Sequence, residues 1–321
     1  MNTFPCRLLA ICALLFTFTA SGQDYPSKPS RIIVTVLPGG GSDLLARLIA
    51  GRLSETLGKP FVVEYRPGAD SAIGLEAIAK APADGYTLGV ATSGMSIHQA
   101  LAPKKRPFDV IRDFTPIILL ATTTTVLAGK AALPPDTIGA LIDYGRARKD
   151  KMTFASCSNG SSQHIAGELF GQLAGVAMVH VPFKGCTQGI PLVLNGEVDL
   201  IVNTLANLSQ YIKAGKLKAY AITGSRRSQF APDLPTMAEA GLSEYAMDNW
   251  FGMLAPAGIP QPILARLNAE MNATLNRPET RDKLIAMQYD LRGGSAAEFG
   301  AHIKTEIERF SKIQNISIAA Q

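Results

Sequence analysis

Three consecutive glycines, Gly39, Gly40 and Gly41, lie between an apolar, β-branched segment and a run with helical periodicity. Residues 32–36 have the composition of a buried parallel strand, and Ser42 is a suitable N-cap for the helix that follows. A helix N-terminus offers unpaired N–H groups and the positive end of the helix dipole, and glycine lets a ligand approach the backbone closely. The turn therefore predicts an anion site. The alternative is that it serves packing alone, and it matches neither a P-loop nor the dinucleotide-binding pattern.

Three ionisable residues near predicted loops have two interpretations each. Asp43 would either stabilise the helix N-terminus and pair with Arg47, or accept the ammonium group of an amino-acid ligand. His164 would either donate to an anion or cap and pack at a helix start. Lys184 would either pair with a ligand carboxylate or remain solvated.

Strands and helices alternate through the rest of the chain, which is typical of doubly wound α/β units. The loops after residues 37, 65 and 91 would gather at one edge of a parallel sheet, where such folds bind ligands. Residues 92–94 and 156–162 are expected to be loops. We further expect strands at 61–65, 86–91, 152–155, 177–181, 198–202, 218–223 and 250–255, and helices at 73–81, 137–148, 165–174, 262–276, 278–287 and 297–316.

The pattern divides the chain into a leader and two lobes. Residues 1–22 resemble a secretory signal peptide, with one charge, an apolar run too short to span a bilayer, and small residues at Ala20 and Gly22. We expect cleavage before Gln23 and a periplasmic product. Residues 23–122 and 249–321 would form lobe 1, and residues 123–248 lobe 2, with crossing segments near 117–127 and 249–256.

Composition and motifs exclude several classes of function. The 31 Lys and Arg residues exceed the 26 Asp and Glu residues too little to indicate a nucleic-acid partner. The chain contains no G-x-S-x-G, H-E-x-x-H or C-x-x-C motif, and its four histidines lack metal-ligand spacing. We therefore expect no enzyme, no metal and no other cofactor. An α/β cleft enzyme that uses Ser161 and His164 is the disfavoured alternative.

Short motifs along nearly the whole mature chain resemble the Bug family, the periplasmic solute-binding proteins of tripartite tricarboxylate transporters. They are YPSKP at 25–29, PGGGSDLLAR at 38–47, RPGA at 66–69, DGYTL at 84–88, NGSS at 159–162 with His164, AGELF at 166–170, VPFKG at 181–185, PT at 235–236 with EAG at 239–241, and WFG at 250–252 with APAG at 255–258. The resemblance implies a bilobal periplasmic-binding-protein fold of the two-crossover type. It also implies a small carboxylate ligand and delivery to membrane permease subunits, and we expect a monomer. A ligand sensor that docks on a membrane signalling protein is the alternative.

The resemblance also assigns a ligand site, residue by residue. In the first lobe the site would comprise Gly39, Gly40, Gly41, Ser42, Thr92, Ser93 and Gly94. In the second lobe it would comprise Ser156, Asn159, Gly160, Ser161, Ser162, His164, Lys184 and Gly185. Asn203, where the family often has Asp, is a further candidate contact, and its neutral side chain removes a negative charge beside the cleft.

Cys157 and Cys186 are the cysteines that remain after the leader, and both lie in loops at strand ends of the same lobe. An oxidising compartment would allow a disulfide, and two separate thiols are the alternative. If the glycine turn holds the anion, Gly40→Val should abolish binding without unfolding the chain, whereas Gly294→Val should leave affinity unchanged. Ser161→Ala should weaken binding by about one to two powers of ten.

Overall fold

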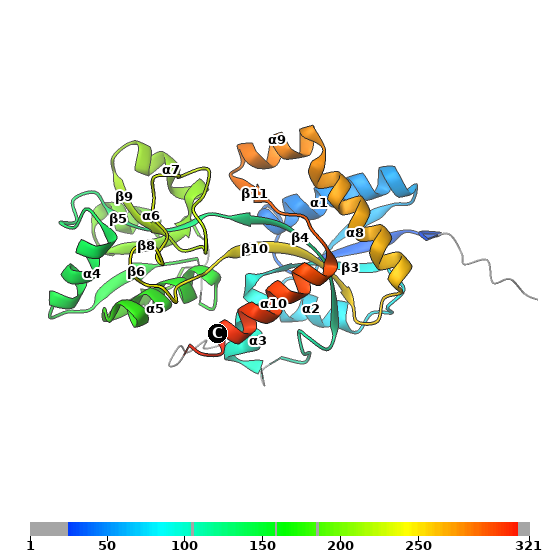
Figure 1. The fold of residues 1–321 in the computed structure, drawn as a ribbon, viewed down its shortest axis with the longest axis horizontal. Helices are drawn as coiled ribbons and strands as arrows, with labels where there is room; N and C mark the ends of the chain where they lie inside the picture. Colours follow the sequence, from blue (N-terminus) through cyan, green and yellow to red (C-terminus); the bar gives the residue numbers. More distant parts are fainter. Residues whose placement is uncertain (1–24, 104–105, 158, 184–185, 314–321) are drawn as a thin grey trace, which may run out of the picture.

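Two mixed α/β units, each built on one sheet, make up the computed structural model of the protein, which describes residues 25–103, 106–157, 159–183 and 186–313 (Figure 1). The chain passes between the units along two long crossover segments. One is β4 (Phe114–Thr123) running into β5 (Thr125–Lys130), and the other leads into β10 (Asn249–Pro256). The predicted bilobal α/β organisation is confirmed.

The first sheet has six strands in the order β11-β4-β10-β3-β1-β2. Strand β1 is parallel to β2 and β3, whereas β10 and β11 pair antiparallel to their neighbours. Its remaining strands are β1 (Ser30–Val34), β2 (Phe61–Tyr65), β3 (Thr87–Thr92) and β11 (Tyr289–Leu291). The helices that cover it are α1 (Gly41–Leu57), α2 (Ala72–Ala79), α3 (Ser93–Leu101), α8 (Gln261–Asn276), α9 (Pro278–Ala286) and α10 (Ala296–Phe310).

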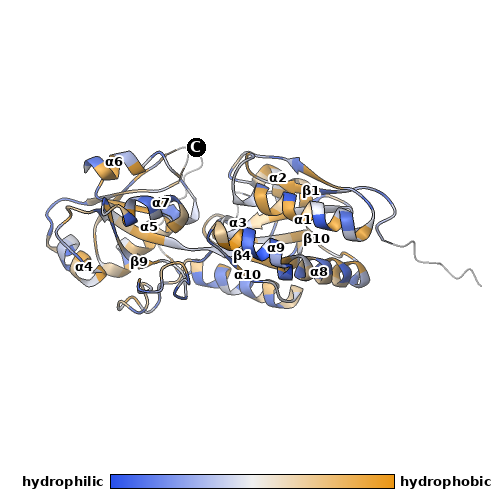
Figure 2. Cartoon of the chain, turned by 90° about the horizontal axis from the view of Figure 1, so that it is seen from above, coloured by the Kyte–Doolittle hydropathy of each residue, from blue (hydrophilic) through white to orange (hydrophobic). Residues whose placement is uncertain are grey.

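Both faces of this sheet are buried, because successive side chains of a strand point to opposite sides. Ile32 and Val34 pack with the apolar residues of α1 and α8, whereas Ile33 packs with those of α2, α3 and α10. The helices are correspondingly hydrophobic on one side and hydrophilic on the other (Figure 2). In that view α10 lies on the side of β4 and β10 away from α2 and α6.

The second sheet has five strands in the order β7-β6-β8-β5-β9, of which β6 is parallel to β7 and β8, and β5 is antiparallel to β8 and β9. Its remaining strands are β6 (Met152–Ala155), β7 (Met178–Val181), β8 (Leu200–Thr204) and β9 (Leu217–Ile222). Its helices are α4 (Ile138–Ala147), α5 (Ser162–Ala174), α6 (Ile190–Asn195) and α7 (Leu205–Lys213). Among the described residues, none of the helices is both long and apolar enough to cross a bilayer.

Several local predictions were wrong. The first helix begins at Gly41 with Gly40 as its N-cap, so Ser42 lies inside its first turn. Residues 92–94 were expected to be a loop, yet Thr92 ends β3 and Ser93 begins α3. Ser and Gly favour turns and caps, and here they open a helix whose buried residues, such as Met95 and Ile97, decide its formation. The short helices α6 and α7 were not predicted.

Candidate functional site

A cavity of about 530 Å³ lies between the two units and is lined by strand-end loops of both. The first unit contributes the segments that follow β1, β2 and β3, and the second contributes the loop that leads into α5. The crossover strand β10 contributes Asn249 and Phe251. The prediction that loops at the carboxyl ends of the strands gather in one place is therefore confirmed.

The structure brings together some of the predicted ligand-binding residues and separates others. Those that line the cavity are Ser42, Thr92, Ser93, Gly94, Asn159, Gly160, Ser161 and Ser162. Those among the described residues that do not line it are Gly39, Gly40, Gly41, Ser156, His164 and Asn203. Lys184 and Gly185 lie outside the described residues.

Asp43 occupies the place where the sequence predicted an external anion. Its carboxylate accepts hydrogen bonds from the Gly39 N–H (2.8 Å), from Arg47 Nε (2.7 Å) and from the Tyr65 hydroxyl (2.6 Å). The Tyr65 hydrogen bond, the Gly39 N–H and Arg47 lower the pKa of Asp43 against the opposing effect of burial. The first interpretation of Asp43 is confirmed: this carboxylate neutralises the N-terminal end of α1 and pairs with Arg47.

The three glycines differ in what surrounds them. A Cβ on Gly41 would lie 2.4 Å from Tyr289 Oη and 2.8 Å from Phe251 Cζ, whereas a Cβ on Gly40 would meet no atom of the described residues within 4 Å. Gly39 has a φ of +96°, which favours glycine. The expected steric block at Gly40 therefore has no structural basis. Packing requires a glycine at Gly41, where a Cβ would collide with Tyr289 and Phe251. The proposed control at Gly294 is also unsuitable, since its φ of +99° would strain any side chain.

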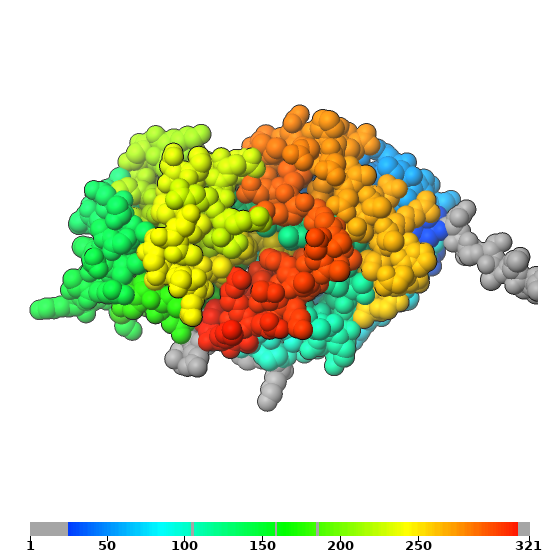
Figure 3. Space-filling model, viewed as in Figure 1, coloured from blue at the N-terminus to red at the C-terminus, as the bar shows by residue number. Residues whose placement is uncertain are grey.

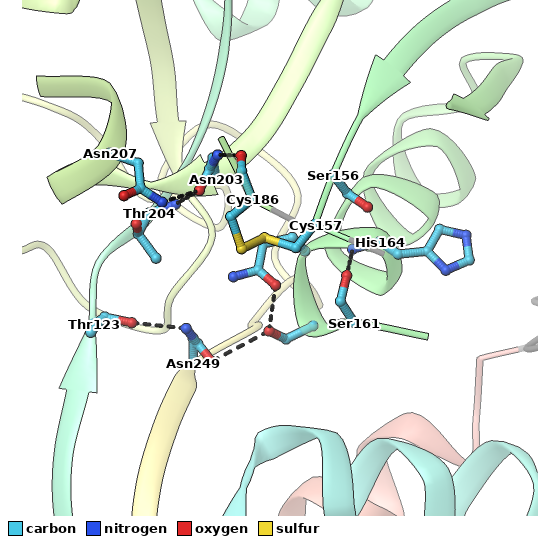
Figure 4. Close-up of a disulfide and its surroundings, with 12 residues drawn as sticks. Thr123, Ser156, Cys157, Ser161, His164, Cys186, Asn203, Thr204, Asn207 and Asn249 are labelled. Atoms are coloured by element: carbon cyan, nitrogen blue, oxygen red, sulfur yellow. Dashed lines mark hydrogen bonds between the residues drawn. A yellow bond between two sulfur atoms is a disulfide. The ribbon is translucent and has the colours of Figure 1, made fainter. Parts of the chain in front are cut away.

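The loop before α5 is fixed by its own hydrogen bonds. Ser161 is the N-cap of α5, and its Oγ accepts from the His164 N–H (3.2 Å), as Figure 4 shows. His164 Nδ1 accepts from the Gly160 N–H (3.1 Å), and its buried ring stacks on His180 at 3.9 Å between centroids. His180 Nε2 in turn lies 2.6 Å from Ser156 Oγ, and burial lowers the pKa of His180 to about 3. The capping and packing interpretation of His164 is confirmed.

Asn249 links the two units at the base of the cavity. Its Oδ1 accepts from Ser93 Oγ on α3 and from Ser162 Oγ on α5, each at 3.3 Å. Its Nδ2 donates to Thr123 Oγ1 on β4 at 2.8 Å (Figure 4). Sequence reasoning missed this residue, although a polar side chain at the start of an otherwise apolar strand could have indicated it.

A disulfide joins Cys157, which follows β6, to Cys186 in the loop before α6 (Figure 4). The backbone carbonyl of Cys186 accepts from Asn203 Nδ2, and Asn203 Oδ1 accepts from the Thr204 N–H (2.7 Å) and from Asn207 Nδ2 (3.0 Å). Asn203 is fully buried, so it holds this loop in place and does not face the cavity. Cys186 lines the cavity itself.

Among the residues that the structure describes, the ionisable groups that line the cavity are Asp70 and His98. Burial, with a smaller effect of Arg106, lowers the pKa of His98 to about 4, so its imidazole is neutral at pH 7. Arg106 Nη1 donates to the carbonyl of Ala69 (2.7 Å) and holds the loop that carries Asp70. No Lys or Arg of the described residues lines the cavity. Among the described residues, the donors that the cavity offers to an acid are neutral N–H and hydroxyl groups. Residues 69–71 all have positive φ, which their sequence did not reveal.

A cavity between two α/β units that are joined by crossover strands is the arrangement of a solute-binding protein. Residues 45–317 match the family model of the tripartite tricarboxylate transporter family receptor, and the chain belongs to this family. The resemblance to Bug proteins is thereby confirmed. Members of this family are periplasmic binding proteins.

Relatives of known sequence or structure match almost the whole chain. Protein BugT of Bordetella pertussis is 36% identical over 315 residues, which are 96% of this chain and 96% of BugT. Rpa4515 of R. palustris, solved with adipate, is 34% identical, has a TM-score of 0.76, and is matched over 90% of this chain and 97% of its own. MatC of Rhodopseudomonas palustris, solved with bound malate, is 30% identical with a TM-score of 0.75, over 89% of this chain and 99% of its own.

Proposed function

We propose that the protein captures a small organic acid in the interlobe cavity and delivers it to the membrane subunits of a tripartite tricarboxylate-type transporter. The observation that carries this proposal is the convergence of Ser93 and Ser162 on Asn249, which brings polar groups of both units to one cavity. Residues 23–122 and 249–321 form one lobe and residues 123–248 the other, and closure about the crossover strands encloses the acid. Residues 1–22 form the cleaved signal peptide of a periplasmic product.

The ligand class is a dicarboxylate between malate and adipate in length. The cavity of about 530 Å³ has the size of a small-molecule site. Two related proteins were solved with such acids. The neutral hydroxyl and N–H donors of Ser42, Ser93 and residues 159–162 suit carboxylates at each end of the ligand. Asp70 would repel a carboxylate placed beside it, so the acid lies with its charged ends away from this side chain.

Calorimetric titration with malate, adipate and intermediate dicarboxylates tests this function. Ser162→Ala removes a hydroxyl of the cavity, and a hydrogen bond to a charged group is worth about 1.5–3 kcal/mol, so affinity should fall roughly ten- to hundredfold. Ser209→Ala is the matched control, because Ser209 lies on α7 outside the cavity. Unchanged affinity in Ser162→Ala, or no binding of any dicarboxylate by the parent, would contradict the proposal.

Ser161→Ala needs a different control, because this residue also caps α5. Loss of an N-cap costs about 0.5–2 kcal/mol of stability whether or not a ligand is bound. Thr137 caps α4 through the Ala140 N–H (3.2 Å) and lies outside the cavity. Thr137→Ala should therefore lower stability as Ser161→Ala does and leave affinity unchanged.

Delivery to the transporter needs a cellular test. Uptake of the acid is measured in cells from which the gene for this protein has been deleted, with and without its re-expression.

A further inference from the structure

A second hollow lies on the face of the molecule that carries α10, between segments far apart in the sequence. Figure 3 shows it bordered by residues that precede β10, by the β11 region and by α10. Two adjoining cavities of about 140 and 160 Å³ form it and share Thr122, Arg226, Asp248 and Arg292. We call it the dorsal groove. It shares no lining residue with the interlobe cavity.

Three guanidinium groups of the dorsal groove have unused hydrogen-bond donors. Arg292 Nε donates to Thr122 Oγ1 (3.1 Å), and Arg309 Nη1 donates to the Ala246 carbonyl (3.1 Å). Within the described parts of the chain, the Arg226 side chain makes no hydrogen bond or salt bridge, and neither Arg292 nor Arg309 has a carboxylate within 4 Å. Each guanidinium carries five N–H donors, so most of them remain available.

Two carboxylates of the groove accept hydrogen bonds from neutral groups of the protein. Asp248 accepts from the Ser225 N–H (3.2 Å) and from Ser225 Oγ (2.9 Å), and Asp290 accepts from Gln229 Nε2 (2.8 Å). Glu306 is neutral at pH 7, because burial raises its pKa to about 8. Three arginines without a carboxylate partner among the described residues thus face two carboxylates, which leaves an excess of positive charge.

The pKa of Arg292 is consistent with an excess of positive charge in the groove. Burial, followed by the positive charge of Arg226, lowers the pKa of Arg292 in spite of Asp290 and Asp248. The fourth arginine of the groove, Arg227, is paired with Glu239 at 2.9 Å and does not take part. An anion between Arg226 and Arg292 would relieve their repulsion and use their free donors in bidentate hydrogen bonds.

We propose that the dorsal groove binds a small free oxyanion of the phosphate or sulfate type between Arg226 and Arg292, at a site separate from the interlobe cavity. The two cavities are each less than a third of the volume of the interlobe cavity, which suits an ion of a few heavy atoms. Arg226 follows β9 of the second sheet and Arg292 follows β11 of the first. The ion therefore bridges the two units behind the crossover strands.

The test is calorimetric titration of the full mature protein with phosphate and sulfate, against chloride at equal ionic strength. Arg226→Gln and Arg292→Gln should each weaken oxyanion binding about tenfold or more while dicarboxylate affinity stays near that of the parent. Arg281→Gln is the matched control, because Arg281 is an exposed arginine on α9 outside the groove. Ser162→Ala should bind phosphate like the parent.

A second measurement does not depend on variants. Phenylglyoxal modifies arginines, and phosphate should protect Arg226 and Arg292, but not Arg281, in peptides analysed by mass spectrometry. Oxyanion binding that is unchanged in both arginine variants, equal loss in Arg281→Gln, or no protection would overturn the proposal. Sedimentation with phosphatidylglycerol vesicles in the absence of free phosphate binding would also overturn it, since the anion would then be a lipid headgroup.

Discussion

Gly41→Ala tests whether the glycine turn before α1 serves packing or ligand approach. The added Cβ would lie 2.4 Å from Tyr289 Oη and 2.8 Å from Phe251 Cζ, so both rings must move. Overpacking of this kind costs about 1–3 kcal/mol, and the better helix propensity of alanine returns at most about 1 kcal/mol. We expect a net loss of roughly 1–2 kcal/mol in the free energy of unfolding. Because Phe251 also lines the interlobe cavity, dicarboxylate affinity should fall as well.

Two further glycines of the same region provide controls. Gly51 lies in the middle of α1 with open space around it, so Gly51→Ala should stabilise the protein by about 0.5–1 kcal/mol. Gly40 is extended and equally open, so Gly40→Ala should change stability by less than about 0.5 kcal/mol and leave affinity unchanged. Urea unfolding and calorimetry measure both quantities. If Gly40→Ala lost affinity while Gly41→Ala kept full stability, the glycines would serve ligand approach and our reasoning would be wrong.

Two other perturbations test the stability of the fold. Replacing Cys157 and Cys186 together by Ser should lower the free energy of unfolding by about 3 kcal/mol, because the bond closes a long loop in the unfolded chain; equal urea midpoints would contradict this. Burial raises the pKa of Glu306 from 4.5 to about 8, so the native state holds this proton more tightly than the unfolded chain. The free energy of unfolding should therefore fall as the pH rises from about 4.5 to about 8, by roughly 5 kcal/mol at most. Glu306→Gln should remove this slope between pH 5 and 8, and a retained slope would assign it to another group.

Local pattern predicted much of the fold, since strands such as β2 have the bounds that their composition indicated. It also predicted which loops gather, because the edge of a parallel sheet follows from strand order. The contacts that build the base of the cavity could not be predicted in this way. Asn249 meets Ser93 and Ser162 across 156 and 87 residues of sequence, and no local pattern encodes such convergence.

The crossover segment at 117–127 shows a second limit of local pattern. Its apolar and threonine-rich sequence was expected to cross between lobes, and it does so as two strands, β4 and β5, in different sheets. Both strands pair antiparallel with their neighbours, so neither sheet is wholly parallel. Strand direction is set by where the chain enters each sheet, which depends on tertiary packing and not on the periodicity of the segment.

Strand β10 places the two proposed sites on opposite faces of one element. Asn249 and Phe251 line the interlobe cavity, whereas Trp250 between them is fully buried and its Nε1 donates to Glu306 Oε2 at 2.5 Å. Glu306 lines the dorsal groove. Alternate side chains of a strand point to opposite faces. A shift of β10 at these three residues would therefore move Asn249 and Phe251 in the interlobe cavity and Trp250, the partner of Glu306, together. With an acid in the cavity and an oxyanion in the groove, as proposed, any change that one ligand makes in the affinity of the other must be reciprocal and of the same factor.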